Sequence, residues 1–221
     1  MSAEEPSPAD TSRLELADWR RRVAELYADV RHAAIVDPAI AHALWIEVRE
    51  RLFRTHPQSP VPVERRAAFR ALHWPYDPTL RFEVAVEPEP APSPGAPEVP
   101  PIALPNSGAD VLAFDRIGSV AIPFPAGERR LSLFWMAGYA GGLFLAFRDA
   151  TNGAETYGAG RYLLDAAKSA DLGGDPELGT VVLDFNFAYQ PSCAFDPRWA
   201  CPLAPPENRL DLAIRAGERI A

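Results

Sequence analysis

Hydrophobic positions recur at helical spacing through the first third of the chain. Over residues 14–31 they fall three or four residues apart, which predicts an amphipathic helix. A second helix is predicted after Asp37, which can serve as its N-cap, with Pro38 in the first helical position, and this helix stops before Pro57. A short third helix is predicted over residues 65–72.

From Leu80 the hydrophobic pattern changes to a period of two. Apolar side chains at 80, 82, 84 and 86 alternate with Arg81, Glu83 and Ala85, which is typical of a half-buried strand. Further strands are predicted at residues 111–114, 118–124, 129–136, 142–147, 156–164, 181–185 and 210–214. Because turn signals separate these segments and no helix of crossover length lies between them, we expect an antiparallel, meandering sheet. The predicted fold class is α+β, mainly β, as a barrel-like domain or a two-sheet sandwich with an N-terminal helical cap.

The same patterns divide the chain into parts. Residues 1–12 are polar, small and proline-bearing, which indicates a disordered tail. Residues 13–78 form a helical N-terminal segment, and residues 79–221 form the β-rich domain. Prolines dominate residues 88–105, and because proline lacks an amide donor we expect an exposed loop there and not a strand.

Composition and charge narrow the functional classes. The 221 residues are 48% hydrophobic, which suffices for one domain with a core. The net charge of −8 repels phosphate groups, so we expect no nucleic-acid binding and no binding to anionic membranes, while small ligands and protein partners stay open. No stretch reaches the roughly 20 apolar residues of a membrane span, and the amino terminus lacks the basic-then-apolar order of a signal peptide. We therefore expect a cytoplasmic protein; the pattern does not indicate its oligomeric state.

The densest polar segment is FRDATNGAETYGAGRYL, residues 147–163. Asn152 and Gly153 predict a tight hairpin turn there. The candidate ligand-binding residues in this segment are Arg148, Asp149, Glu155, Tyr157 and Arg161. In a structural interpretation, Arg148 pairs with Asp149 or Glu155 to close the hairpin. In a functional one, Arg161 beside Tyr157 holds an anion.

Two further groups of polar residues follow. Asp184 and Asn186 lie on one side of a predicted strand, and because buried polar groups must be paired, they either bond a neighbouring loop or face a ligand. Glu207, Asn208 and Arg209 enter the last predicted strand from a proline-rich stretch, where they either stabilise the loop or join the same pocket.

The two cysteines, Cys193 and Cys201, lie in a proline-rich loop. Zinc would need two more ligands, for which His73 is a candidate along with Asp196, so these residues predict at most a weak metal site. The alternative is a pair of partly buried thiols or an optional disulfide. The chain has no glycine-rich nucleotide fingerprint, no HExxH and no GxSxG, so the sequence leaves any cofactor unknown.

Four ordered segments carry a family resemblance: SPVPVERRAAFRALHWPYDP, LFLAFRDATNGAETYGAGRYL, VLDFNFAYQPSCAFDPRWACPLAPPENRL and AIRAGER. From about Trp45 to the carboxyl terminus the chain resembles the bacterial and archaeal family named domain of unknown function 1684. The resemblance implies one domain of about this length and no assigned activity. The chain departs from the family pattern in its extra helical segment before Ile40 and in its enlarged proline run.

Three functional hypotheses follow from these residues. The first is a barrel-like domain that binds a small anionic or polyhydroxylated ligand through the nine arginine, carboxylate, tyrosine and asparagine side chains at 148, 149, 155, 157, 161, 184, 186, 207 and 209. The second is an enzyme with Asp184 or Glu155 as general base and Tyr157 as proton donor. The third is a structural or partner-binding protein that uses its proline run or an exposed helix.

Overall fold

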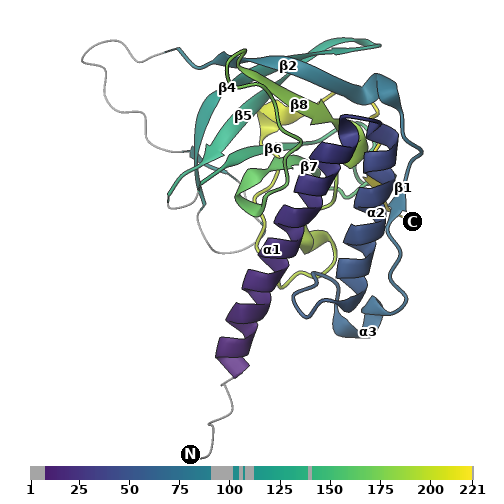
Figure 1. Ribbon diagram of the computed structural model, residues 1–221. Coiled ribbons are helices and arrows are strands. Elements are labelled where there is room, and N and C mark those ends of the chain that lie inside the picture. The colour runs from purple at the N-terminus through teal and green to yellow at the C-terminus, as the bar shows by residue number, and fades with distance from the viewer. Residues whose placement is uncertain (1–7, 91–101, 105–106, 108–111, 139–140, 221) are drawn as a thin grey trace, which may run out of the picture.

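A computed structural model describes residues 8–90, 102–104, 107, 112–138 and 141–220. Its helical part contains α1 (Pro8–Ala34), α2 (Pro38–Thr55) and the single turn α3 (Val63–Arg66). Asp37 caps α2 as predicted, because its side chain accepts a 2.8 Å hydrogen bond from the amide of Ala39. Figure 1 shows α1 and α2 as an antiparallel pair that lies against the sheet, with the first turns of α1 projecting beyond it.

Two predictions for the helical part were wrong. The helix begins at Pro8, so residues 8–12 do not belong to a tail; a proline suits the first helical position because it has no amide to satisfy there. The third helix covers residues 63–66 and not 65–72, because Leu72 and His73 form the short strand β1 that pairs with β9 (Glu218–Arg219). Residues 1–7 of the predicted tail lie outside the described residues.

The main sheet is antiparallel and runs in the order β7-β6-β5-β4-β2-β8, with β3 added beside β4. The strands are β2 (Arg81–Pro88), β3 (Ile102–Ala103), β4 (Ala113–Phe124), β5 (Gly127–Met136), β6 (Leu143–Phe147), β7 (Arg161–Asp165) and β8 (Thr180–Asp184). Short 3-10 turns connect them or follow them: η1 (Pro78–Leu80), η2 (Ala166–Lys168), η3 (Phe185–Phe187), η4 (Ser192–Ala194) and η5 (Pro206–Asn208).

The sheet curls into a half-barrel whose edges, β7 and β8, are not paired with each other. The segment after β8 comes back to β7 at one point, where the backbones of Tyr162 and Tyr189 exchange hydrogen bonds of 2.8 and 3.1 Å. We call this place the seam. The fold class, α+β and mainly β with N-terminal helices, is confirmed.

Several strand predictions needed correction. Two predicted strands at 111–114 and 118–124 are one strand, β4, with an irregularity between Arg116 and Gly118, and residues 102–103 form a strand inside the predicted loop. Residues 156–160 are irregular, because the amides at 154, 155 and 156 all turn back to the carbonyl of Thr151. Residues 210–214 form no strand, since only isolated hydrogen bonds join them to residues 148–150. Most of the predicted loop, 91–101, lies outside the described residues.

The helices and the sheet share apolar packing. Leu26 and Tyr27 of α1 and Trp45 of α2 pack in one buried cluster with Val182 of β8 and Phe187 of η3. A larger cluster fills the concave interior of the half-barrel. The helical pair therefore covers the sheet close to the seam, which is where the candidate site lies.

Candidate functional site

Arg161, the predicted anion-binding arginine, is wholly buried and already paired. Its Nη2 donates to Asp149 Oδ2 at 2.6 Å and to the carbonyl of Ile214 at 2.8 Å, and its Nη1 donates to the carbonyls of Ala216 and Glu218. Burial lowers the pKa of Arg161, while the Asp149 carboxylate acts against that shift. The side chain thus fastens the C-terminal segment to β7, and its one nitrogen without a hydrogen-bond partner among the described residues, Nε, is itself buried.

The other predicted residues of the segment 147–163 do not meet at a hairpin tip. Asp149 Oδ1 accepts hydrogen bonds from the backbone and hydroxyl of Thr151, while Arg148 donates to the carbonyl of Ala159 at 3.3 Å. Glu155 pairs with Arg215 at 2.8 Å on the surface, which lowers the pKa of Glu155. The predicted pairing of Arg148 with Asp149 or Glu155 was wrong. The tight turn at Asn152 and Gly153 is present, because the amide of Ala154 donates to the carbonyl of Thr151 at 3.2 Å and Gly153 has a φ of +82°, but β7 begins only at Arg161, so this turn does not join two strands directly.

Asp184 and Asn186 bond neighbouring loops. Asp184 caps η3 through the amide of Asn186 at 3.0 Å and accepts the hydroxyl of Tyr76, also at 3.0 Å. Asn186 holds both the amide and the carbonyl of Asp77 at 2.8 Å. Burial raises the pKa of Asp184, but the side chain is fully enclosed by these partners and Arg81.

The side chain of Asn208 also bonds the backbone of neighbouring segments, whereas the adjacent residues Glu207 and Arg209 lie on the surface. Its amide binds both backbone groups of Ser132 at 2.7 and 2.9 Å and the carbonyl of Ala146 at 3.0 Å. Glu207 and Arg209 are exposed. The nine predicted ligand-binding residues therefore do not surround one cavity, and none of them lines the cavity described next.

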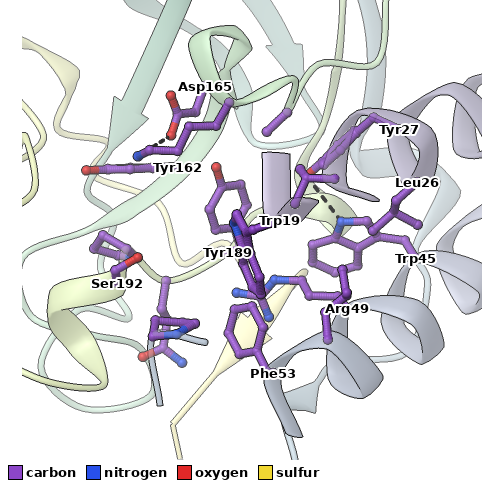
Figure 2. Close-up of a pocket in the computed structure, with 17 residues that line it drawn as sticks. Trp19, Leu26, Tyr27, Trp45, Arg49, Phe53, Tyr162, Asp165, Tyr189 and Ser192 are labelled. Atoms are coloured by element: carbon purple, nitrogen blue, oxygen red, sulfur yellow. Dashed lines mark hydrogen bonds and ion pairs between the residues drawn. The ribbon is translucent and has the colours of Figure 1, made fainter. Parts of the chain in front are cut away.

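That cavity has a volume of about 90 Å³ and lies between the helical pair and the seam. Figure 2 shows aromatic side chains from α1, α2 and the seam pointing toward one another around it. Its lining consists of Trp19, Val23, Leu26, Tyr27, Trp45, Arg49, Leu52, Phe53, Pro60, Tyr162, Asp165, Lys168, Ala170, Tyr189, Gln190, Pro191 and Ser192.

Arg49 is the charged group that the helical pair contributes to the wall of the cavity. Its guanidinium makes two 3.0 Å hydrogen bonds to the carboxylate of Glu218, and both side chains are buried. The guanidinium carbon also lies 4.2 Å from the ring centre of Phe53 and 5.3 Å from those of Trp45 and Tyr189. The bidentate pair fixes α2 to β9. The guanidinium also lies against the aromatic rings that line the cavity.

The wall formed by β7 and η2 carries a second ion pair, and tyrosines line both sides of the cavity. Lys168 donates to Asp165 at 2.9 Å and is itself about half exposed, so it can also reach a ligand. The hydroxyl of Tyr27 accepts a 3.2 Å hydrogen bond from the indole of Trp45. Burial raises the pKa of Tyr27 and of Tyr189, so both hydroxyls stay protonated at neutral pH.

A second hollow of about 170 Å³ continues from this cavity. The two share Trp19, Val23, Pro60, Lys168 and Ser192, and the second extends under α1 to Trp199 and Cys201. Apart from aromatic residues at helical spacing, the sequence contains no signal for this groove, because its walls come from segments more than a hundred residues apart.

Cys193 and Cys201 are free thiols that touch each other. The amide of Cys193 donates to Cys201 Sγ at 3.3 Å, and the hydroxyl of Tyr157 donates to Cys193 Sγ at 3.8 Å. His73 lies elsewhere, with its ring centre 5.5 Å from that of Trp45. Within the described ranges no three His, Cys, Asp or Glu side chains are grouped closely enough to hold a metal ion, and the structure does not bring His73 to the thiols. In the same part of the chain, no helix is long and apolar enough to cross a membrane.

Comparison with known proteins gives a family match and similar solved structures. The family model described as protein of unknown function (DUF1684) matches residues 67–219, a shorter range than the one predicted from Trp45 onward. The chain is 32% identical to an uncharacterized protein of Haloarcula marismortui whose solution NMR structure superposes with a TM-score of 0.54, over 79% of this chain and 90% of that one. No curated protein matches the chain.

Proposed function

Because the chain belongs to the DUF1684 family, whose description names no activity, we propose its function from the geometry alone: it binds a small ring-containing molecule in the cavity between the helical pair and the seam. The observation that carries the proposal is the aromatic lining of that cavity. Clefts lined by apolar and aromatic side chains with a few polar groups are the usual form of small-ligand sites.

The lining determines the chemistry of the ligand. The rings of Trp19, Trp45 and Phe53 offer flat apolar surfaces, which suit a planar ring better than the polyhydroxylated molecule expected from the sequence. Apolar cavities of roughly 150 Å³ bind benzene. This cavity of about 90 Å³ is smaller, so a ring bound in it would extend into the adjoining groove of about 170 Å³. A carboxylate on the ring would pair with the half-exposed Lys168.

The test compares three probes of different chemistry. Benzoate, benzyl alcohol and glucose are added to the full chain, and binding is followed by saturation-transfer NMR and by titration calorimetry. We expect binding of the two aromatic probes, with benzoate the tighter because of Lys168, and no binding of glucose. A Lys168→Gln variant should remove the difference between benzoate and benzyl alcohol.

A cavity-filling variant distinguishes a binding site from a packing gap. Ser192 lines the cavity and is half-buried, so Ser192→Phe should weaken benzyl alcohol at least about tenfold. Ser119, half-buried on β4 far from the cavity, gives the matched control Ser119→Phe. If neither aromatic probe binds and Ser192→Phe only stabilises the fold, the cavity is a packing gap and the proposal is wrong.

A further inference from the structure

The loop that carries Cys193 and Cys201 holds the two sulfur atoms in fixed positions. Cys193 lies in η4, whose turn is closed by a 2.9 Å hydrogen bond from Ala194 to Pro191. The indole of Trp199 donates to the carbonyl of Pro60 at 3.2 Å, and the amide of Cys201 donates to the hydroxyl of Ser107 at 2.9 Å. The thiols also hydrogen-bond each other. In the part of the chain that the structure describes, none of the hydrogen bonds to the two sulfurs comes from the helical pair, although Cys201 also lines the groove that continues from the cavity.

The two thiols are in different environments. Cys193 is half-buried and reachable from solvent, whereas Cys201 is only 3% exposed. Such an asymmetry suits a pair in which the outer sulfur attacks an oxidant and the inner sulfur then closes a disulfide. An internal disulfide needs no third partner, which fits the absence of a third metal ligand near the pair among the described residues.

Hydrogen-bond donors converge on Cys193 Sγ. They are the hydroxyl of Tyr157, at 3.8 Å, and the thiol of Cys201; the nearby Ser107 hydroxyl donates to the carbonyl of Trp199 at 3.0 Å. The contact with the Cys201 thiol lowers the pKa of Cys193 to about 6, and the same contact, together with burial, raises the pKa of Cys201. Burial raises the pKa of Tyr157 to about 12, so its hydroxyl keeps a proton to donate.

We propose that Cys193 and Cys201 are a redox-active thiol pair that reduces a hydroperoxide and closes an internal disulfide. The Cys193 thiolate attacks one peroxide oxygen, the O–O bond breaks, and the leaving oxygen takes a proton from Tyr157 or water to give an alcohol or water. Cys193 becomes a sulfenic acid, R–SOH. The Cys201 sulfur then attacks it, an S–S bond forms, and water leaves with the Cys201 proton. The two thiols together lose two electrons and the peroxide gains them.

The first experiment uses the reduced full chain and hydrogen peroxide. One equivalent should consume both thiols, with a mass loss of two hydrogen atoms and a crosslink between the peptides that contain 193 and 201. At pH 7 the thiolate fraction of Cys193 would be about thirtyfold that of free cysteine with its pKa of ~8.5, so we expect oxidation at least about tenfold faster than that of free cysteine. Iodoacetamide alkylation of Cys193 should have its midpoint near pH 6.

Variants separate the two roles. Cys201→Ser should stop at the sulfenic acid, seen as a gain of one oxygen and trapped by dimedone on Cys193, whereas Cys193→Ser should lose the fast reaction. Tyr157→Phe should slow the first step severalfold, while Tyr76→Phe, a tyrosine change far from the sulfurs, should not. Oxidation no faster than that of free cysteine, or fast oxidation that yields no 193–201 crosslink, would overturn the proposal.

Discussion

The clearest quantitative prediction concerns Arg161, because the sequence suggested a ligand-binding role and the structure gives it structural contacts. In an Arg161→Met variant the Asp149 carboxylate loses its only cationic partner among the described residues, and three backbone carbonyls lose their donors. Breaking a buried ion pair by removing one partner costs ~3–5 kcal/mol, and each orphaned buried acceptor costs ~1–3 kcal/mol when it cannot relax toward water. We therefore expect a loss of about 4 kcal/mol or more in the free energy of unfolding.

Urea unfolding followed by tryptophan fluorescence measures this loss. For an m-value of about 2 kcal/mol per molar urea, the midpoint should fall by about 2 M. Arg215→Met is the matched control, because Arg215 also makes a short arginine–carboxylate pair, with Glu155, but does so on the exposed surface. We expect its midpoint to stay within the experimental error.

A double variant tests the cause of the loss. Arg161→Met combined with Asp149→Leu removes both charges, so it should recover part of the stability, though not all, because Asp149 also accepts hydrogen bonds from Thr151. If Arg161→Met shifts the midpoint no more than Arg215→Met does, the buried pair is not what secures the C-terminal segment. The residue would then be free for the ligand-binding role that its sequence suggested.

Three further predictions concern buried groups. Burial lowers the pKa of both His42 and His73 from 6.5 to about 4, so between these pH values the unfolded chain binds more protons than the folded one. The stability from the two histidines is therefore full above pH 6.5 and falls toward pH 4, and each histidine should cost up to ~2 kcal/mol in the free energy of unfolding between pH 7 and 5. A His42→Phe variant should show a shallower pH dependence of this free energy in urea unfolding. Asn208→Asp removes the amide donors to two buried carbonyls and should cost about 2–4 kcal/mol in a thermal melt, a result that an unchanged melting temperature would contradict. Gly160→Ala should lower the melting temperature strongly, because φ is +104° and a Cβ would lie 2.5 Å from a carbonyl oxygen of β6, whereas Gly158→Ala, with its nearest atom at 3.8 Å, should not.

The parts of the fold that were predictable are those whose causes are local. The cap and first proline of α2 lie side by side in the sequence, and the period-two pattern over β2 follows from one buried face. The predictions failed where distant contacts decide the structure. Residues 156–160 look like strand, yet the amides of 154–156 turn back to the carbonyl of Thr151 and the amide of Gly160 to that of Tyr157. The predicted helix over 65–72 likewise ends early, because Leu72 pairs with β9.

The site was less predictable than the fold, for a related reason. Arg161 has the appearance of a ligand residue in the sequence because its partners, at 149 and 214–218, are separated from it by a strand and a long loop. The residues of the cavity were missed for the opposite reason. In the sequence Trp19, Trp45 and Tyr189 each look like ordinary core residues, and they line a cavity only because the fold brings them together at the seam. A local pattern can suggest which side chains are polar, but it does not say which of them remain unpaired after folding.

The two proposals depend on different parts of the chain, and the range matched by the family model separates these parts. The model that defines the family covers residues 67–219, and that range contains Ser107, Tyr157 and both cysteines, so the whole sulfur environment belongs to the family domain. The cavity takes its other wall from α1 and α2, which lie before residue 67. Ligand binding at the seam therefore requires the helical pair, because without it the aromatic wall and the Arg49–Glu218 pair are missing. The thiol chemistry requires only that the loop between η4 and Cys201 keep its two sulfurs in contact.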